Sequence, residues 1–252
     1  MKPRSLVSLF LIMSLVLLGC RKTEPDSKES VEEETTIQVE PTDKALVVFF
    51  SRAGDQFHVG RIVEGNTAIV AKMISKKTGA DLYEIKPKVD KYNLDYKQLA
   101  ELAKKEQDGR GRPEYLKPAP DFSQYDVVFI GSPVWWGDWP MIMYSFFEDN
   151  ELQGKKLIPF STHAGSELAR FDYRLANIYP YCSILKGLAV LGEDAQNDRD
   201  KVGADVDAWL KELGFEIKPS ETSEDASIES SNEDSSQSPS EQKSETIESS
   251  GE

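Results

Sequence analysis

Five stretches of the chain are continuously apolar, or alternate apolar with polar residues, over lengths typical of β-strands. The run Val127-Val128-Phe129-Ile130 contains no polar residue at all. Such a run favours a strand buried on both faces, as in a parallel sheet covered by helices. The predicted strands cover residues 45–50, 82–85, 127–130, 155–160 and 185–191.

Apolar residues recur at helical spacing in the segments between and after these strands. Helices are predicted at residues 65–79, 95–107, 140–147, 168–176 and 198–213. Strands that alternate with helices predict an α/β fold with a doubly wound parallel sheet and helices on both faces. In such sheets a ligand binds outside the carboxyl ends of the strands, where the strand order reverses.

The negative charge of the chain lies mainly outside this alternating region. The formal net charge is −14: residues 1–20 carry +2, residues 21–43 carry −5, residues 219–252 carry −9, and residues 44–218 carry only −2. Both flanks hold too little apolar surface to fold, so we expect a disordered tether at 21–43 and a disordered, acidic Ser/Glu-rich tail at 219–252. Residues 44–218 form the predicted domain. No basic stripe supports nucleic-acid binding.

Residues 1–20 have the pattern of a secretory signal, because Lys2 and Arg4 precede an apolar stretch too short for a stable membrane span. The stretch ends in Leu17-Leu18-Gly19-Cys20, which resembles the lipobox of bacterial lipoproteins. The resemblance implies lipidation at Cys20 and an extracytoplasmic, membrane-anchored protein. An ordinary signal peptide with an incidental cysteine is the alternative. Cys182 then has no disulfide partner within the chain, and we interpret it as a small core residue.

Small polar residues and tryptophans gather where three of the predicted strands end. The first strand leads to Ser51-Arg52 and, after an insert, to Gly65-Asn66-Thr67 at the start of a helix, where free backbone N–H groups suit a phosphate. The third strand leads to Gly131-Ser132-Pro133-Val134-Trp135-Trp136-Gly137, whose tryptophans either cover a flat apolar ring or fill the edge of the core. The fourth leads to Thr162-His163-Ala164-Gly165-Ser166.

These three loops, in this order, resemble the flavin-binding loops of the flavodoxins over about residues 44–215. The middle loop is most similar to a flavodoxin-like subgroup with the pattern Pro-x-Trp-Trp-Gly. The resemblance implies a five-stranded sheet of order 2-1-3-4-5 and a bound FMN. The insert between Ser51 and Thr67 is longer than the compact phosphate loop usual in flavodoxins, which leaves open which backbone amides contact the phosphate.

The resemblance also assigns candidate cofactor-binding residues. The phosphate would be held by Ser51, Arg52, Gly65, Asn66 and Thr67, the ring by Pro133, Val134, Trp135, Trp136 and Gly137, and the pyrimidine edge by Thr162, His163, Gly165 and Ser166. Some of these side chains have other interpretations: Arg52 as an exposed arginine, and His163 as a surface loop residue. Glu167 is expected to cap the next helix and point to solvent. No catalytic residue and no metal ligand is assigned.

A further pattern, Thr78-Gly79-Ala80-Asp81, partly resembles the core of exported proteins that carry FMN on a threonine. Asp81 departs from that pattern, and a helix cap followed by a strand explains the stretch equally well. We therefore expect the FMN to be noncovalent.

Three functions compete. The first is electron transfer by a flavodoxin-like FMN protein at the outer face of a bacterial membrane, between a redox donor and acceptor that the sequence does not identify. The second is an FMN-dependent NAD(P)H:quinone-type oxidoreductase, so whether the chain is an enzyme stays open. The third is a non-redox binding module that has lost the flavin.

Overall fold

A computed structural model describes residues 37–218 of the chain. The chain divides into two units, 1–36 and 37–252, and the described residues belong to the second unit. The predicted signal segment, Cys20, residues 21–36 of the predicted tether, and the predicted tail therefore lie outside the described residues. Within the described part, no helix has both the length and the apolar character needed to cross a membrane.

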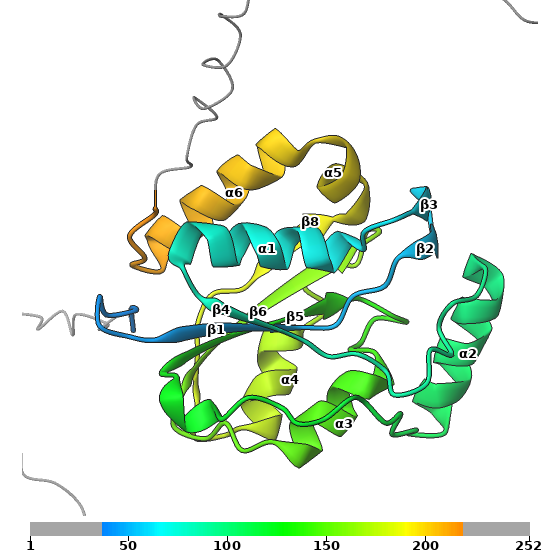
Figure 1. The fold of residues 1–252 in the computed structure, drawn as a ribbon, viewed down its shortest axis with the longest axis horizontal. Helices are drawn as coiled ribbons and strands as arrows, with labels where there is room; N and C mark the ends of the chain where they lie inside the picture. Colours follow the sequence, from blue (N-terminus) through cyan, green and yellow to red (C-terminus); the bar gives the residue numbers. More distant parts are fainter. Residues whose placement is uncertain (1–36, 219–252) are drawn as a thin grey trace, which may run out of the picture. The chain divides into compact units, whose positions relative to one another are not determined.

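A six-stranded sheet forms the centre of the described region (Figure 1). Its strands run in the order β4-β1-β5-β6-β7, with β8 also paired to β6, and every pairing is parallel. The strands are β1 (Ala45–Phe49), β4 (Asp81–Glu84), β5 (Val127–Pro133), β6 (Lys156–His163), β7 (Ser183–Ile184) and β8 (Leu188–Leu191). This confirms the predicted doubly wound fold and the order 2-1-3-4-5.

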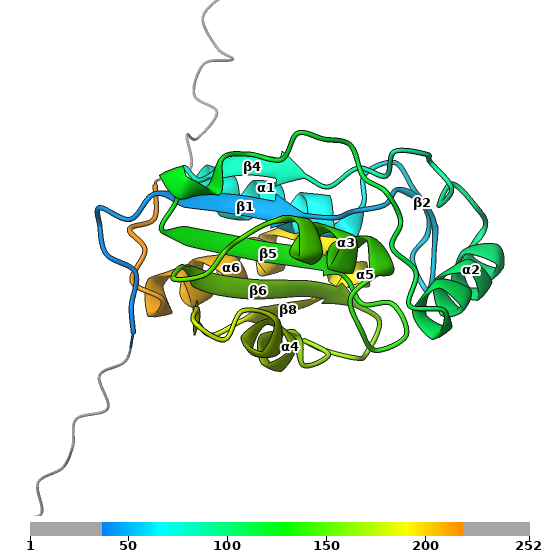
Figure 2. The same ribbon diagram turned by 90° about the horizontal axis from the view of Figure 1, so that it is seen from below.

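Helices cover both faces of the sheet, as the continuous apolar strands predict. Helices α1 (Asn66–Thr78), α5 (Gly192–Asn197) and α6 (Arg199–Glu212) lie on one face, and α3 (Met141–Asp149) and α4 (Phe171–Ile178) lie on the other (Figures 1 and 2). Successive side chains of a strand point to opposite faces. In β1, Val47 packs into the cluster that holds α1 and α6, and Val48 packs into the cluster that holds α3 and α4.

Helix α2 (Tyr96–Asp108) lies beyond the carboxyl ends of the strands, beside a short antiparallel hairpin of β2 (Gly54–Gln56) and β3 (Gly60–Ile62) (Figure 2). The side chain of Asp95 caps α2 by accepting a hydrogen bond from the Gln98 N–H at 2.9 Å. The hairpin was not predicted. Its strands have three residues each and none of them is buried, so they leave no periodic signal in the sequence.

Three other differences from the predicted elements are local. The predicted fifth strand is split into β7 and β8, both parallel to β6, and α5 precedes α6. Helix α4 begins at Phe171, three residues after the predicted start, because residues 167, 169 and 170 adopt left-handed backbone conformations that no helix accommodates. A short 3₁₀ helix, Phe122–Gln124, precedes β5.

Residues 37–43 belong to the predicted tether, yet they contact the domain. Val39 is 6% exposed, and its N–H donates to the carbonyl of Leu213 at 3.0 Å. An apolar side chain that finds a partner surface becomes ordered even within a polar segment. Both ends of the described region lie at the amino ends of the strands, opposite to α2 and the hairpin (Figure 1).

Candidate functional site

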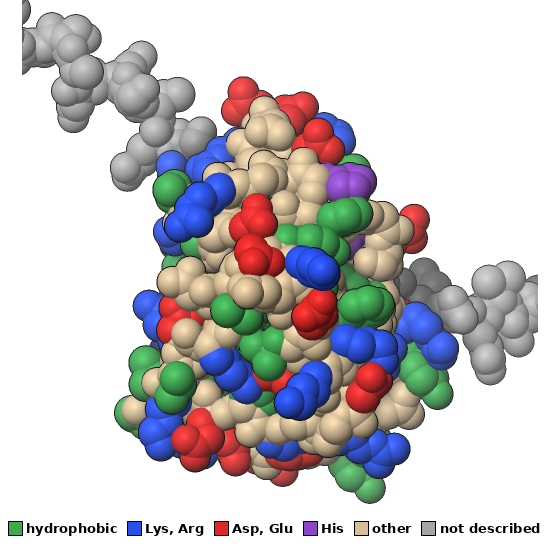
Figure 3. Space-filling model, turned by 90° about the vertical axis from the view of Figure 1, so that its right-hand side faces the viewer, with side chains coloured by type: hydrophobic (Ala, Val, Ile, Leu, Met, Phe, Trp, Pro, Cys, Tyr) green, Lys and Arg blue, Asp and Glu red, His purple; other side chains and the backbone are tan. Residues whose placement is uncertain are grey.

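A cavity of about 340 Å³ opens at the carboxyl ends of the strands. Its lining combines the ends of β5 and β6 with the start of α1, the β2–β3 hairpin, α2 and the junction of β8 with α5. Figure 3 faces this end of the molecule and shows hydrophobic side chains gathered near its centre. Four large apolar side chains of the lining are also exposed to solvent: Phe57, Tyr96, Trp136 and Leu191.

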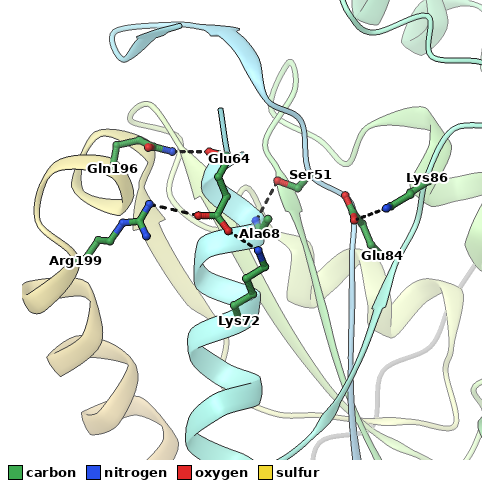
Figure 4. Close-up of polar contacts among 8 residues, drawn as sticks. All are labelled: Ser51, Glu64, Ala68, Lys72, Glu84, Lys86, Gln196 and Arg199. Carbon is green, nitrogen blue, oxygen red and sulfur yellow. Dashed lines mark hydrogen bonds and ion pairs between the residues drawn. The ribbon is translucent and has the colours of Figure 1, made fainter. Parts of the chain in front are cut away.

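The first predicted loop brings the end of β1 against the start of α1. Ser51 Oγ accepts a hydrogen bond from the N–H of Ala68 at 3.0 Å (Figure 4). A Cβ on Gly65 would lie 2.3 Å from Ser51 Oγ, so only glycine permits this close approach. No partner for the N–H groups of Asn66 and Thr67 is found within residues 37–218, and Gly65 supplies no side-chain cap. The first turn of α1 therefore keeps two donors available for an anion.

Residues around Asn66 fix its side chain at the cavity. Gln196 of α5 donates to the Glu64 carbonyl at 2.8 Å (Figure 4). It also donates to Asn66 Oδ1 at 2.7 Å, and Asn66 itself lines the cavity. The Glu64 carboxylate pairs with Lys72 at 2.6 Å and with Arg199 at 3.4 Å. The hydrogen bond from Lys72 lowers the pKa of Glu64, so this carboxylate stays ionised beside both cations.

Arg52 has partners other than the predicted phosphate. Its guanidinium donates to the carbonyls of Tyr92 (2.8 Å), Asp55 and Leu94, and it does not line the cavity. Burial lowers the pKa of Arg52, with a partial opposing effect from Asp55. Arg52 thus joins the hairpin to the segment before α2, a structural role that its position after a strand does not reveal.

Thr67 and Thr162 meet behind the cavity wall. Their hydroxyl oxygens lie 2.7 Å apart, and the two residues are 1% and 3% exposed. The bond joins the first turn of α1 to the end of β6, so two of the predicted loops share one buried contact. Thr162 also lines the cavity.

The two tryptophans of the second loop and Trp139, two residues after it, occupy three different environments. Trp135 forms part of the cavity wall, and its ring packs edge-on against Phe50 (5.5 Å between centroids) and Tyr92 (5.3 Å). Trp136 is 55% exposed and donates from Nε1 to the Ala100 carbonyl at 2.9 Å. Trp139 is buried and stacks on Phe171 in the core. Pro133 and Val134 line the cavity and Gly137 does not.

The third loop places an imidazole at the cavity. His163 Nδ1 accepts a hydrogen bond from the Gly165 N–H at 3.0 Å, so the neutral ring carries its hydrogen on Nε2 and offers a donor there. Burial lowers the pKa of His163, which favours this neutral form at pH 7. Gly165 and Ser166 also line the cavity. Glu167 does not cap α4, because the N-cap position of that helix is Arg170.

Sequence reasoning missed the outer wall of the cavity. Phe57 at the hairpin tip stacks on Tyr96 of α2, with 5.0 Å between centroids and 25° between planes. Asp55 accepts a hydrogen bond from the Tyr96 N–H at 2.9 Å, which fastens the hairpin to α2. The chain has two histidines, and the other one, His58, lines the same cavity as His163. The only sequence signals for this wall were the aromatic residue Phe57 and the histidine His58 within the insert between Ser51 and Thr67.

The charge of the lining is low. Apart from the two histidines, Glu193 is the one acidic or basic residue among the described lining residues. An anion in this cavity would therefore be held by backbone N–H groups and neutral polar side chains rather than by lysine or arginine. The rest of the lining suits a flat, uncharged ring.

The Thr78-Gly79-Ala80-Asp81 segment lies at the other end of the sheet, away from the cavity. Thr78 Oγ1 donates to the Ile74 carbonyl at 2.8 Å, and Gly79 forms a left-handed C-cap. These contacts are typical of a helix C-terminus, and Thr78 does not line the cavity.

The sheet order and the cavity at the strand ends define a doubly wound α/β protein with a binding site at its topological switch point. Residues 44–213 match the family model described as flavodoxin, which is more than half of the chain. The chain therefore belongs to the flavodoxin family.

Two solved structures of Bacteroides proteins share the fold. A protein of Bacteroides eggerthii DSM 20697, named as a candidate flavoprotein, is 29% identical, with a TM-score of 0.53 over 68% of this chain and 98% of its own. A protein of Bacteroides uniformis ATCC 8492, named in the same way, is 28% identical, with a TM-score of 0.53 over 67% and 98%. A flavoprotein in complex with FMN from Lactobacillus acidophilus NCFM is 20% identical, with a TM-score of 0.48 over 62% and 97%. A search of curated proteins finds no match.

Proposed function

We propose that this chain binds FMN noncovalently in the cavity at the strand ends and transfers electrons between redox partners. The observation that carries the proposal is the convergence of three loops on one cavity. The start of α1 contributes two N–H donors that have no partner within residues 37–218, and Trp135 and Trp136 form an aromatic wall. Membership of the flavodoxin family supports it, as does the resemblance of the middle loop to the Pro-x-Trp-Trp-Gly pattern.

The residues present fit the parts of FMN. The N–H groups of Asn66 and Thr67 would bind the phosphate, assisted by the positive end of the α1 dipole. Trp135 would cover the ring, and the Nε2–H of His163 would donate to an acceptor at its polar edge. FMN itself supplies the electron-accepting ring, while these side chains orient it and exclude water.

The test is reconstitution of the purified protein with FMN. We expect a yellow protein that retains flavin on gel filtration, is bleached by dithionite and regains its colour in air. Loss of all flavin on the column would contradict FMN binding. The remaining function would then be that of a non-redox binding module that has lost the flavin. Retained flavin that dithionite does not bleach would contradict electron transfer.

A second candidate function, an FMN-dependent oxidoreductase that takes hydride from NAD(P)H and reduces a quinone, is favoured by one observation. The cavity extends past the three predicted loops to the uncharged side chains of Phe57, Tyr96 and Leu99. Such a wall suits a neutral planar substrate beside the flavin. Oxidation of NAD(P)H by the reconstituted protein on addition of a quinone would support the enzyme, and its absence would support the carrier.

We also propose export and anchoring through a lipid on Cys20, which places the domain outside the cytoplasm. The ends of the described region lie at the opposite end of the sheet from α2 and the β2–β3 hairpin (Figure 1), and these two elements line the cavity. This separation would leave the cavity accessible to partners. Substitution C20A should abolish labelling by a fatty acid and release the protein from the membrane fraction. Unchanged labelling would contradict the proposal.

A further inference from the structure

Asn66 opens α1 at the cavity, and its side-chain amide has two chemically different ends. The oxygen Oδ1 only accepts hydrogen bonds, and the nitrogen Nδ2 only donates them. The end that faces the cavity therefore decides whether this side chain attracts or repels the oxygen atoms of a ligand. Because the two ends have nearly the same shape, their hydrogen-bond partners determine the orientation.

The orientation of Asn66 follows from one backbone carbonyl, that of Glu64. A carbonyl oxygen only accepts, so Gln196 must turn its nitrogen Nε2 toward it, at 2.8 Å (Figure 4). The same Nε2 lies 2.7 Å from the Asn66 side chain. A donating nitrogen requires an acceptor, so the end of Asn66 that faces Gln196 is Oδ1. One carbonyl thus orients two side-chain amides in succession.

This orientation leaves Nδ2 of Asn66 for the cavity. Nδ2 has no hydrogen-bond partner among residues 37–218, and it is not fully enclosed. A Cβ on Gly192 would lie 2.4 Å from Nδ2, and Gly192 itself lines the cavity. The free donor therefore lies against the part of the cavity wall that the start of α5 forms.

Helix α5 holds the Asn66 amide with one of its faces. Gly192 and Gln196 are four residues apart in this helix, so they lie on the same side of it. Gln196 binds the amide oxygen, and Gly192 leaves room for the amide nitrogen. Because Gly192 has a helical backbone, the close approach of Asn66 is what requires glycine at this position.

The orientation of this one amide matters because the described lining of the cavity contains no lysine or arginine. The nearby cations Lys72 and Arg199 pair with the Glu64 carboxylate, which ties the Glu64 segment to α1 and α6 (Figure 4). A phosphate at the start of α1 would therefore depend on neutral donors. A reversed Asn66 amide would replace one of these donors with an oxygen that repels the phosphate.

We propose that Gln196 is a positioning residue that presents the Nδ2–H of Asn66 to the phosphate of FMN, and that it thereby favours FMN over riboflavin. The inference rests on the function proposed above. It assigns a part in the choice of flavin to a residue that does not line the cavity and lies 130 positions from Asn66 in the chain.

The test compares the full-length protein with Q196M, which keeps a long side chain but removes both hydrogen bonds, and with N150L as a matched control. Asn150 likewise donates from its amide nitrogen to two acceptors, the Phe146 carbonyl at 2.7 Å and the Tyr115 hydroxyl at 3.0 Å, but it does not line the cavity. Fluorescence titrations give the dissociation constants of FMN and of riboflavin. In the apoprotein, the nuclear Overhauser effect between the Asn66 side-chain NH₂ and the α-hydrogens of Gly192 reports the orientation of the amide.

We expect Q196M to bind FMN about tenfold more weakly than the wild type, because the phosphate loses a hydrogen bond from Asn66. The affinity for riboflavin should not change, since riboflavin has no phosphate. N150L should keep the wild-type ratio of the two dissociation constants. The nuclear Overhauser effect should be present in the wild type and in N150L and absent in Q196M.

A second variant, G192A, reaches the same amide without removing Gln196. Its methyl group would occupy the place of Nδ2 and displace the amide. G192A should therefore also weaken the binding of FMN and leave the binding of riboflavin unchanged. This variant answers the question if Q196M does not fold.

Two results would overturn the inference while leaving the proposed function intact. One is a wild type that prefers FMN together with the same preference in Q196M and G192A. The other is a nuclear Overhauser effect that persists in Q196M, because the amide would then be held without Gln196. Failure of the wild type to bind FMN would instead refute the proposed function and the role of Gln196 in flavin choice, while the apoprotein measurement still tests the orientation of Asn66.

Discussion

At the scale of single residues, the buried hydroxyl pair of Thr67 and Thr162 gives the sharpest stability prediction. Each substitution to valine, T67V or T162V, leaves the other hydroxyl buried without a partner and should cost about 1–3 kcal/mol in the free energy of unfolding. The double variant removes both groups and should be closer to the wild type than either single variant. Urea unfolding measures all four proteins, and additive losses in the double variant would show that the two hydroxyls do not depend on each other.

His163 gives a prediction on pH at the same scale. Burial lowers the pKa of His163 in the folded protein below the ordinary value of 6.5. As the pH falls through 6.5, the unfolded chain binds a proton that the folded protein does not bind, so the stability decreases toward lower pH. The melting temperature of H163Q should therefore fall less than that of the wild type between pH 7 and pH 5, and H58Q serves as the control from the same cavity.

NMR provides the direct measurement for this histidine. The imidazole resonances of His163 should titrate with a midpoint below 6.5. A midpoint at or above that value would contradict the burial that the structure assigns to the side chain, whatever the melting temperatures of the variants.

Single residues also show where sequence reasoning reached its limit. Asn66, Trp135 and His163 were predicted for the site and line one cavity. Trp135 and His163 lie at the ends of strands that are easy to identify, and Asn66 opens the helix that follows the first strand and its insert. The three backbone partners of Arg52 were not predictable, because they belong to segments up to 42 residues away that no local pattern connects to it.

At the scale of elements, close strand packing makes one glycine of β5 sensitive to substitution. A Cβ on Gly131 would lie 2.0 Å from Cζ of Phe160 on the neighbouring strand β6. G131A should therefore destabilise the protein by about 1–3 kcal/mol through overpacking. Gly203 of α6 has open space where its Cβ would be, so G203A should stabilise by about 0.5–1 kcal/mol because alanine favours helices. Chemical denaturation measures the change in the free energy of unfolding for G131A and for G203A. Equal destabilisation of the two variants would contradict the close packing at Gly131.

The elements were predicted to the extent that they bury apolar surface. The central strands and α1, α2 and α6 carry periodic apolar residues and were placed within a few residues of their ends. The β2–β3 hairpin contacts the rest of the protein through Arg52, Asp55 and Phe57, and these tertiary contacts have no periodicity. The outer wall of the site was missed for this reason.

At the scale of the whole molecule, the fold separates the two ends of the described region, residues 37 and 218, from the cavity. The family model and the sheet order account for the position of the cavity, since the strand order reverses between β1 and β5 and ligands bind at such reversals. Occupation of the cavity should stabilise the folded protein by about 2.7 kcal/mol when the ligand is present at 100 times its dissociation constant.

The measurement that tests the account most directly is an equilibrium titration of the purified protein with FMN and, separately, with riboflavin, followed by quenching of tryptophan fluorescence. The account predicts saturable binding of one FMN per chain and at least about tenfold weaker binding of riboflavin, which lacks the phosphate that the first turn of α1 would hold. Equal affinities would contradict the phosphate site. Unchanged tryptophan fluorescence and no binding of FMN at micromolar concentration would contradict the flavin site as a whole.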